Sequence, residues 1–163
     1  MGNAPTWTQE RAQRNAQIAA LQKQSVCYIC HDFATGAVFG GQTIIYDDDL
    51  FRVVLDDYPR MLGHTIVVYK PHREDISALS EEDAGQLFGF CTKLIRAIKA
   101  GLGAEKVYLN TMCDGGITHL HLQLFPRYPG DPIGSARFVA PRGPLTNGET
   151  IAQAIQEALH ATR

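Results

Sequence analysis

The stretch THLHLQLFPR, residues 118–127, alternates polar and apolar residues along most of its length. Because alternate side chains of a β-strand share a face, a strand at 118–125 would direct its three leucines to one side. The other side would carry His119, His121, Gln123 and Phe125. Polar side chains withdrawn from water need partners. The pattern predicts a polar row that lines a cleft or binds a ligand; an amphipathic edge strand with its polar side in water is the alternative.

The bulk properties fit one globular domain spanning 1–163. The chain has 163 residues, of which 45% are hydrophobic and 20% charged. Its net charge of −2 gives no basic footprint for nucleic acid. No apolar run approaches the roughly 18 residues of a membrane helix, and the N-terminus lacks the apolar stretch of a signal peptide. We therefore expect a cytoplasmic protein with reduced cysteines and no nucleic-acid or membrane partner.

The order of elements predicts an α+β domain. Helix formers fill 8–24, within an N-terminal helical extension at 1–24. Apolar residues recur at helical spacing over 80–103, between Ser80 and a closing GLG. The β-rich runs before the strand at 118–125 lie at 36–57, 63–70 and 106–113. The C-terminal part at 128–163 is predicted to be a proline-rich loop, 128–147, followed by a helix from 148.

Two cysteines three residues apart suggest half of a metal site. Cys27 and Cys30 form a C-x-x-C with no second copy, so histidines must supply any further zinc ligands. The chain has six: His31, His64, His72, His119, His121 and His160. A redox role would require a strand before the motif and a helix beginning at it, whereas a polar helix precedes it here. Two unpaired cysteines of no function are the remaining alternative.

The run GHTIVVYKPH, 63–72, places two histidines at opposite ends of a predicted strand. His64 stands at its start and His72 lies just past Pro71. We therefore expect them to serve different sites; two solvated loop histidines are the alternative.

Taken in order, these runs resemble the histidine triad superfamily from about Cys27 to Arg127. GHTIVVYKPH resembles the family's Gly-His, β-run and Pro-Lys-x-His segment, although the order here is Lys70-Pro71. LNTMCDGGITHLHLQLFPR resembles its Asn, glycine-rich turn and His-x-His-x-His strand ending in Pro-Arg. The resemblance implies a HIT-like fold, an antiparallel sheet of about five strands with a main helix packed on it. It also implies a homodimer, for which the helix at 80–103 is the expected contact.

The C-x-x-C resembles the zinc cysteines of zinc-containing family members. In those members the histidine after the Pro-Lys pair and the first histidine of the triad strand complete the site. The corresponding residues here are Cys27, Cys30, His72 and His119. Four protein ligands leave no open position for water, so the resemblance implies a structural zinc. His31 is a competing ligand, but its neighbour Cys30 makes simultaneous binding awkward.

His121 matches the family's nucleophile. A neutral imidazole has a free lone pair near pH 7, with which it would attack the α-phosphorus of a nucleotide and form a nucleotidyl-imidazole. The resemblance assigns Asn110 to the phosphate or the sugar edge, and His64 to the active-site cluster. It assigns Asp56 to the ribose hydroxyls, with Asp57 as the alternate.

Other residues are expected to bind the substrate. Gly115 and Gly116 let backbone N–H groups approach a phosphate closely, and Thr118 adds a hydroxyl. Arg127 is either structural or reaches a distal phosphate. The superfamily's base pocket is built from apolar residues on early strands, for which the candidates here are Phe51, Val53 and Leu55.

Gln123 departs from the family pattern, since most members have histidine there. Histidine can protonate a leaving group, whereas glutamine can only donate an amide hydrogen bond. Galactose-1-phosphate uridylyltransferases and dinucleoside polyphosphate phosphorylases form the branch with glutamine. Gln123 therefore favours leaving groups that need little protonation, and transfer to a phosphate acceptor over attack by water.

The predicted function is a nucleotide hydrolase or nucleotidyltransferase acting through nucleotidyl-His121. Its substrate would be a dinucleoside polyphosphate, a nucleoside phosphosulfate or a phosphoramidate, cleaved at the α-phosphorus. The first alternative is a catalytically weak nucleotide-binding or sensor protein with a structural zinc. The second is a zinc-stabilised nucleic-acid reader, which the charge balance disfavours. The loop at 128–147 is expected to cover the site and set specificity.

Overall fold

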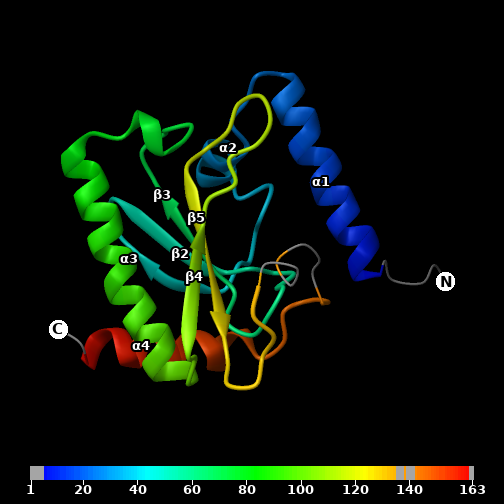
Figure 1. Ribbon diagram of the computed structural model, residues 1–163. Helices are drawn as coiled ribbons and strands as arrows, with labels where there is room; N and C mark the ends of the chain where they lie inside the picture. The colour runs from blue at the N-terminus through cyan, green and yellow to red at the C-terminus, as the bar shows by residue number, and fades with distance from the viewer. Residues whose placement is uncertain (1–5, 135–137, 139–141, 162–163) are drawn as a thin grey trace.

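The computed structural model describes residues 6–134, 138 and 142–161 (Figure 1). Five strands form one sheet in the order β1-β2-β3-β5-β4, and all neighbours are antiparallel. Their bounds are β1 Ile44–Asp47, β2 Phe51–Leu55, β3 Thr65–Tyr69, β4 Lys106–Asn110 and β5 His121–Arg127. The expected α+β architecture with a five-stranded antiparallel sheet is confirmed.

One face of the sheet is covered by α3 (Glu81–Leu102), against which α4 (Gly148–Ala161) packs (Figure 1). The Ser80 hydroxyl accepts the Asp83 N–H at the start of α3, and Gly103 ends the helix in the left-handed conformation, as the sequence predicts. The three leucines at 120, 122 and 124 are fully buried in the core that α3 and α4 share with the sheet. The predicted alternation of β5 is therefore confirmed on its apolar side. None of the described helices is both long and apolar enough to span a membrane.

The opposite side of the sheet carries α1 (Trp7–Lys23) and α2 (Tyr28–Thr35) (Figure 1). The capping box of α1 joins Thr6 and Gln9. No residue of α1 is buried, and the helix is held by side-chain contacts such as Arg14 Nη1 to Asp57 Oδ2, 2.7 Å. The helix of the N-terminal extension therefore lies beside the sheet and outside the hydrophobic core.

Three predicted strand boundaries are wrong, and one α-helix was not predicted. Residues 36–43 of the predicted β-rich run at 36–57 form no strand, because β1 begins at Ile44. The short helix α2 begins at the C-x-x-C, where the Cys27 thiol accepts the Cys30 N–H, and ends at Gly36 with φ +66°. The last strand begins at His121 and continues through Pro126 to Arg127. Pro126 is tolerated because the pairing with β3 ends at Leu124, so no ladder bond is lost on that side. The predicted strand at 106–113 ends at Asn110.

Candidate active site

Four ligand atoms gather where α2, the end of β3 and the start of β5 meet. Cys27, Cys30, His72 and His119 place one donor atom each within 4.8 Å of one another. The His119 Nδ1 lies 3.4 Å from each cysteine sulfur and 3.4 Å from His72 Nδ1. A tetrahedral zinc with ordinary bond lengths would separate two nitrogens by about 3.3 Å, and a sulfur from a nitrogen by about 3.6 Å. The donor set and its spacing therefore fit zinc.

His119 has the tautomer that this cluster needs. Its Nε2–H donates to the carbonyl oxygen of Tyr69 at 2.7 Å, which leaves the Nδ1 lone pair directed at the other three donors. Burial and the neighbouring Cys27 raise the pKa of the Cys30 thiol to about 11. Metal binding must therefore displace a proton from this thiol.

His121 lies on the polar face of β5 and is half-buried. Its Nδ1–H donates to the His119 carbonyl oxygen at 2.8 Å, so in the neutral ring Nε2 carries the free lone pair. Burial opposes the charged form, but interaction with the Cys113 thiol and with the His119 carbonyl outweighs it, and the pKa of His121 is raised. In return, His121 lowers the pKa of Cys113 to about 7. This thiol–imidazole pair was not predicted, because Cys113 precedes the glycine turn and no spacing rule links it to His121.

His64 and Gln123 form a buried pair. The His64 ring is fully buried, and its Nε2–H donates to Gln123 Oε1 at 3.0 Å. Burial, reinforced by the Arg60 charge, holds the pKa of His64 down at about 4, so the ring is neutral at pH 7. It stacks on Phe125, which stacks in turn on Phe138 of the C-terminal loop. Since Oε1 is occupied, the Gln123 amide nitrogen is the group left to donate to a ligand.

Asn110 and Asp56 lie beside this pair. Asn110 is directly opposite Gln123 in the β4–β5 register, so both side chains share one face. Asp56 follows β2; its Oδ1 accepts the Tyr58 N–H at 2.7 Å, and its Oδ2 lies 3.3 Å from His64 Nδ1. The alternate, Asp57, is instead paired with Arg14 of α1.

The glycine turn lies next to the end of α1. Gly115 has φ +100°, and a Cβ there would meet the amide of Gln22 at 3.2 Å. Gly116 is exposed, so both backbone N–H groups lie near the surface. Thr118 is buried and its hydroxyl donates to the Glu74 carbonyl at 2.9 Å, which leaves it little freedom to bind a phosphate.

Two predicted binding residues lie away from this cluster. Phe51 is in the core, where it stacks on Phe90 at 4.7 Å, and the other base-pocket candidates, Val53 and Leu55, are buried there too. Arg52 and Val54 instead line a pocket beside His121, because alternate residues of β2 face opposite sides of the sheet. Arg127 ends β5 and pairs with Glu105 Oε2 at 3.1 Å, which favours its structural role.

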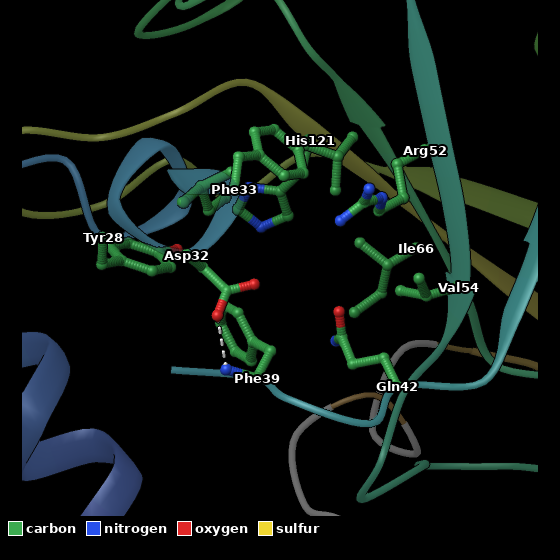
Figure 2. Close-up of a pocket in the computed structure, with 11 residues that line it drawn as sticks. Tyr28, Asp32, Phe33, Phe39, Gln42, Arg52, Val54, Ile66 and His121 are labelled. Carbon is green, nitrogen blue, oxygen red and sulfur yellow. Dashed lines mark hydrogen bonds between the residues drawn. The ribbon is translucent and has the colours of Figure 1, made fainter. Parts of the chain in front are cut away.

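Two adjoining pockets open along the polar face. The first lies against His121 between α2 and strands β2 and β3 (Figure 2). The second includes Gln123 and Asp56 and is lined by Arg11 and Arg14 of α1 and by Arg60. The pockets share Tyr28, Phe39, Gln42 and Ile66. The pocket residues of α2 were not predicted, because the short run 28–35 has no periodicity that identifies it as a helix.

Residues 41–130 of the chain match the HIT domain family. The protein named hit from Bacillus subtilis is 33% identical over 98 residues, which are 56% of this chain and 66% of that protein, just under two thirds of its length.

Solved structures agree with the fold. A hypothetical histidine triad nucleotide-binding protein from Sulfolobus tokodaii superposes with a TM-score of 0.67 and 26% identity, over 83% of this chain and 93% of the other. A zinc-bound histidine triad family protein from Mycobacterium smegmatis gives 0.65 and 23% over 83% and 94%.

Proposed function

Because the chain belongs to the HIT domain family, we propose that it binds a nucleotide and cleaves it at the α-phosphorus through a covalent nucleotidyl-His121 intermediate. The observation that carries the proposal is the state of His121. Its Nδ1–H donates to the His119 carbonyl oxygen, and the ring borders the first pocket (Figure 2). A nucleophile whose tautomer is set by its own strand needs no further base. The description of the Sulfolobus tokodaii neighbour as nucleotide-binding supports the ligand class.

The proposed reaction has two displacements. The Nε2 lone pair of His121 attacks the α-phosphorus, and the bond from phosphorus to the leaving oxygen breaks with its electron pair on that oxygen. An acceptor oxygen then attacks the same phosphorus from the opposite side and releases the imidazole, while the acceptor loses its proton to solvent. The Gln123 amide nitrogen, Asn110 beside it and the N–H groups at Gly115 and Gly116 donate to the phosphate oxygens.

The pair of His64 and Gln123 argues for a leaving group that needs no proton. Glutamine cannot supply one, and the depressed pKa of His64 keeps that ring neutral, with its N–H directed at Gln123. Phosphate and pyrophosphate groups depart as stable anions. The second pocket is lined by three arginines and two aspartates, and Asp57 and Asp56 pair with Arg14 and Arg60. The remaining positive charge suits such anions, whether they leave or act as acceptor. We therefore place a dinucleoside polyphosphate ahead of the other substrates, with transfer to phosphate ahead of hydrolysis.

The covalent intermediate gives the decisive test. Wild type, His121→Ala and the exposed-site control His160→Ala are incubated with ATP, diadenosine tetraphosphate or adenosine phosphosulfate, quenched in base and weighed by mass spectrometry. We expect a mononucleotide adduct in wild type and in the control, and none in His121→Ala. If no nucleotide gives an adduct or turnover although nucleotides bind, the chain is the binding or sensor protein instead. Faster turnover with added phosphate would identify a phosphorylase; equal rates would identify a hydrolase.

We also propose that the four-residue cluster holds a structural zinc. The distances around His119 support it, as does the fact that the Mycobacterium smegmatis neighbour is zinc-bound. Zinc would tie α2 to the ends of β3 and β5. Metal analysis should give about one zinc per chain, lost in a Cys27→Ser/Cys30→Ser double variant. A metal-free wild type purified without chelators would refute this assignment.

A homodimer through α3 stays a prediction. Most of the apolar face of α3 is covered by the sheet and α4, but Phe88 is 39% exposed. Light scattering of wild type and Phe88→Glu would test it: a dimer that becomes monomeric supports α3 as the contact, and a monomeric wild type refutes it.

A further inference from the structure

The first pocket is apolar except at a few points. Aromatic and aliphatic side chains from α2, β2 and β3 form its walls, including Tyr28, Phe33, Val54 and Ile66 (Figure 2). A flat ring bound beside His121 would be enclosed by these groups. The polar groups that enter the pocket are therefore the ones that can distinguish one ring from another.

Asp32 is the one acidic side chain in this lining. It belongs to α2, and its Oδ1 accepts the backbone N–H groups of Val38 and Phe39, both at 2.8 Å. These two bonds fix the orientation of the carboxylate. Figure 2 shows the second oxygen turned away from Phe39 and toward the open space of the pocket. This oxygen has no hydrogen bond or ion pair within the described part of the chain, so a ligand N–H can reach its lone pairs.

A cation faces Asp32 across the pocket without neutralising it. Arg52 of β2 uses its Nε and Nη2 on Asp47 Oδ2, at 3.3 and 2.8 Å, and its guanidinium lies 4.8 Å from the centre of the Phe33 ring. Its Nη1 takes no part in the contacts with Asp47 and can donate to a ligand. Figure 2 shows Arg52 on the wall opposite Asp32, with Gln42 below both. The pocket thus offers an acceptor at one end and a donor at the other.

We propose that this arrangement selects guanine, and that Asp32 is the residue that sets the preference; the inference rests on the proposed nucleotide site. Guanine carries two adjacent N–H donors, at N1 and N2, which the one available Asp32 oxygen can accept together. Its O6 and N7 acceptors lie toward the other end of the ring, where an arginine N–H suits them. Adenine presents a lone pair at N1 and an amino group where guanine has O6, so it meets like groups at both ends.

Binding measurements on the zinc-loaded full chain test the preference. Calorimetry with GMP, IMP and AMP should give the order GMP, then IMP, then AMP, because IMP keeps N1–H but lacks the N2 amino group. A hydrogen bond to a charged group corresponds to roughly a 10- to 100-fold change in affinity. We expect GMP to bind at least about tenfold more tightly than AMP.

The variant Asp32→Asn keeps the acceptor for Val38 and Phe39 but replaces the inward oxygen by an NH₂ group. We expect about 10- to 100-fold weaker GMP binding and unchanged or tighter AMP binding. Asp49→Asn, at an exposed site, removes the same charge and should leave both affinities unchanged. Equal GMP and AMP affinities in wild type would overturn the inference. So would an Asp32→Asn variant that weakens both nucleotides equally, since that would mark a purely structural role.

The two proposals fail separately. Adducts from GTP and ATP at equal rates, with equal affinities, would leave nucleotidyl-His121 intact and remove the guanine preference. A guanine preference in binding without any adduct would leave the Asp32 assignment intact and remove the covalent reaction.

Discussion

Acidification should destabilise this protein through His64. The ring is fully buried, and burial depresses its pKa from the ordinary 6.5 to about 4. His64 therefore binds a proton near pH 6.5 in the unfolded chain, but only near pH 4 in the folded chain. Stability from this group is complete above pH 6.5 and is lost as pH falls toward 4. At about 1.4 kcal/mol per pKa unit, the full loss is about 3 kcal/mol, of which about 2 kcal/mol has gone by pH 5.

Urea denaturation of the zinc-loaded protein at pH 7 and pH 5 measures this loss. With an m-value of about 2 kcal/mol per M, the midpoint should fall by about 1 M between the two values. His64→Leu fills the same space without titrating. It should be less stable at both pH values, because the Gln123 oxygen loses its donor, but most of the pH-dependent fall should vanish.

Two checks separate His64 from other acid effects. His160→Gln removes an exposed histidine and should keep the wild-type pH dependence. Metal content is measured at both pH values, because protonation of the zinc ligands would also destabilise the fold. The reasoning is refuted if His64→Leu loses as much stability between pH 7 and pH 5 as wild type does, at equal metal content.

Four further predictions follow from packing and from the site. Leu122→Ala should cost about 2–5 kcal/mol in urea denaturation, since the side chain is fully buried; a cost below about 1 kcal/mol would contradict that. Gly101→Ala should cost about 1–3 kcal/mol because its Cβ would lie 2.4 Å from the Ala154 carbonyl oxygen, and an unchanged stability would refute the close approach of α3 and α4. Gln123→His should raise cleavage of nucleoside phosphoramidates relative to dinucleoside polyphosphates, because it restores a general acid; an unchanged ratio in steady-state assays would count against it. Removing zinc by chelation should lower the melting temperature measured by calorimetry, and re-addition should restore it; an unaltered melting temperature would deny the metal a structural role.

Structure is predicted best from the sequence where a periodic pattern of residues is compatible with only one element and one orientation. The leucines at 120, 122 and 124 alternate with polar residues, and that parity alone determines which side of β5 meets the core. The capping signals at Ser80 and Gly103 likewise define α3. The four expected zinc ligands are predicted by the resemblance to a family pattern, and the structure brings all four together.

The lining of the pocket beside His121 could not be predicted in this way, because polar and apolar residues do not alternate along β2. Its sequence FRVVL is apolar at four of five positions, and four are buried. Which parity faces the pocket depends on pairing with β1 and β3, so Val54 could not be told from Val53 by inspection. The position of Asp32 at this pocket could not be predicted for a different reason: α2 is only eight residues long, too short for its periodicity to indicate which residues face the sheet.

His119 connects the four-residue cluster to His121, the proposed nucleophile, which begins β5 two residues further along the chain. Its Nδ1 faces the cluster, its Nε2–H is held by Tyr69, and its carbonyl oxygen accepts the Nδ1–H of His121. A shift of His119 would move the acceptor that fixes the tautomer of His121. Two residues further on, Gln123 is oriented in the same way by the buried His64. His121 and Gln123 are thus each oriented by a buried histidine, so the geometry of the proposed site depends on the rigidity of the fold around them.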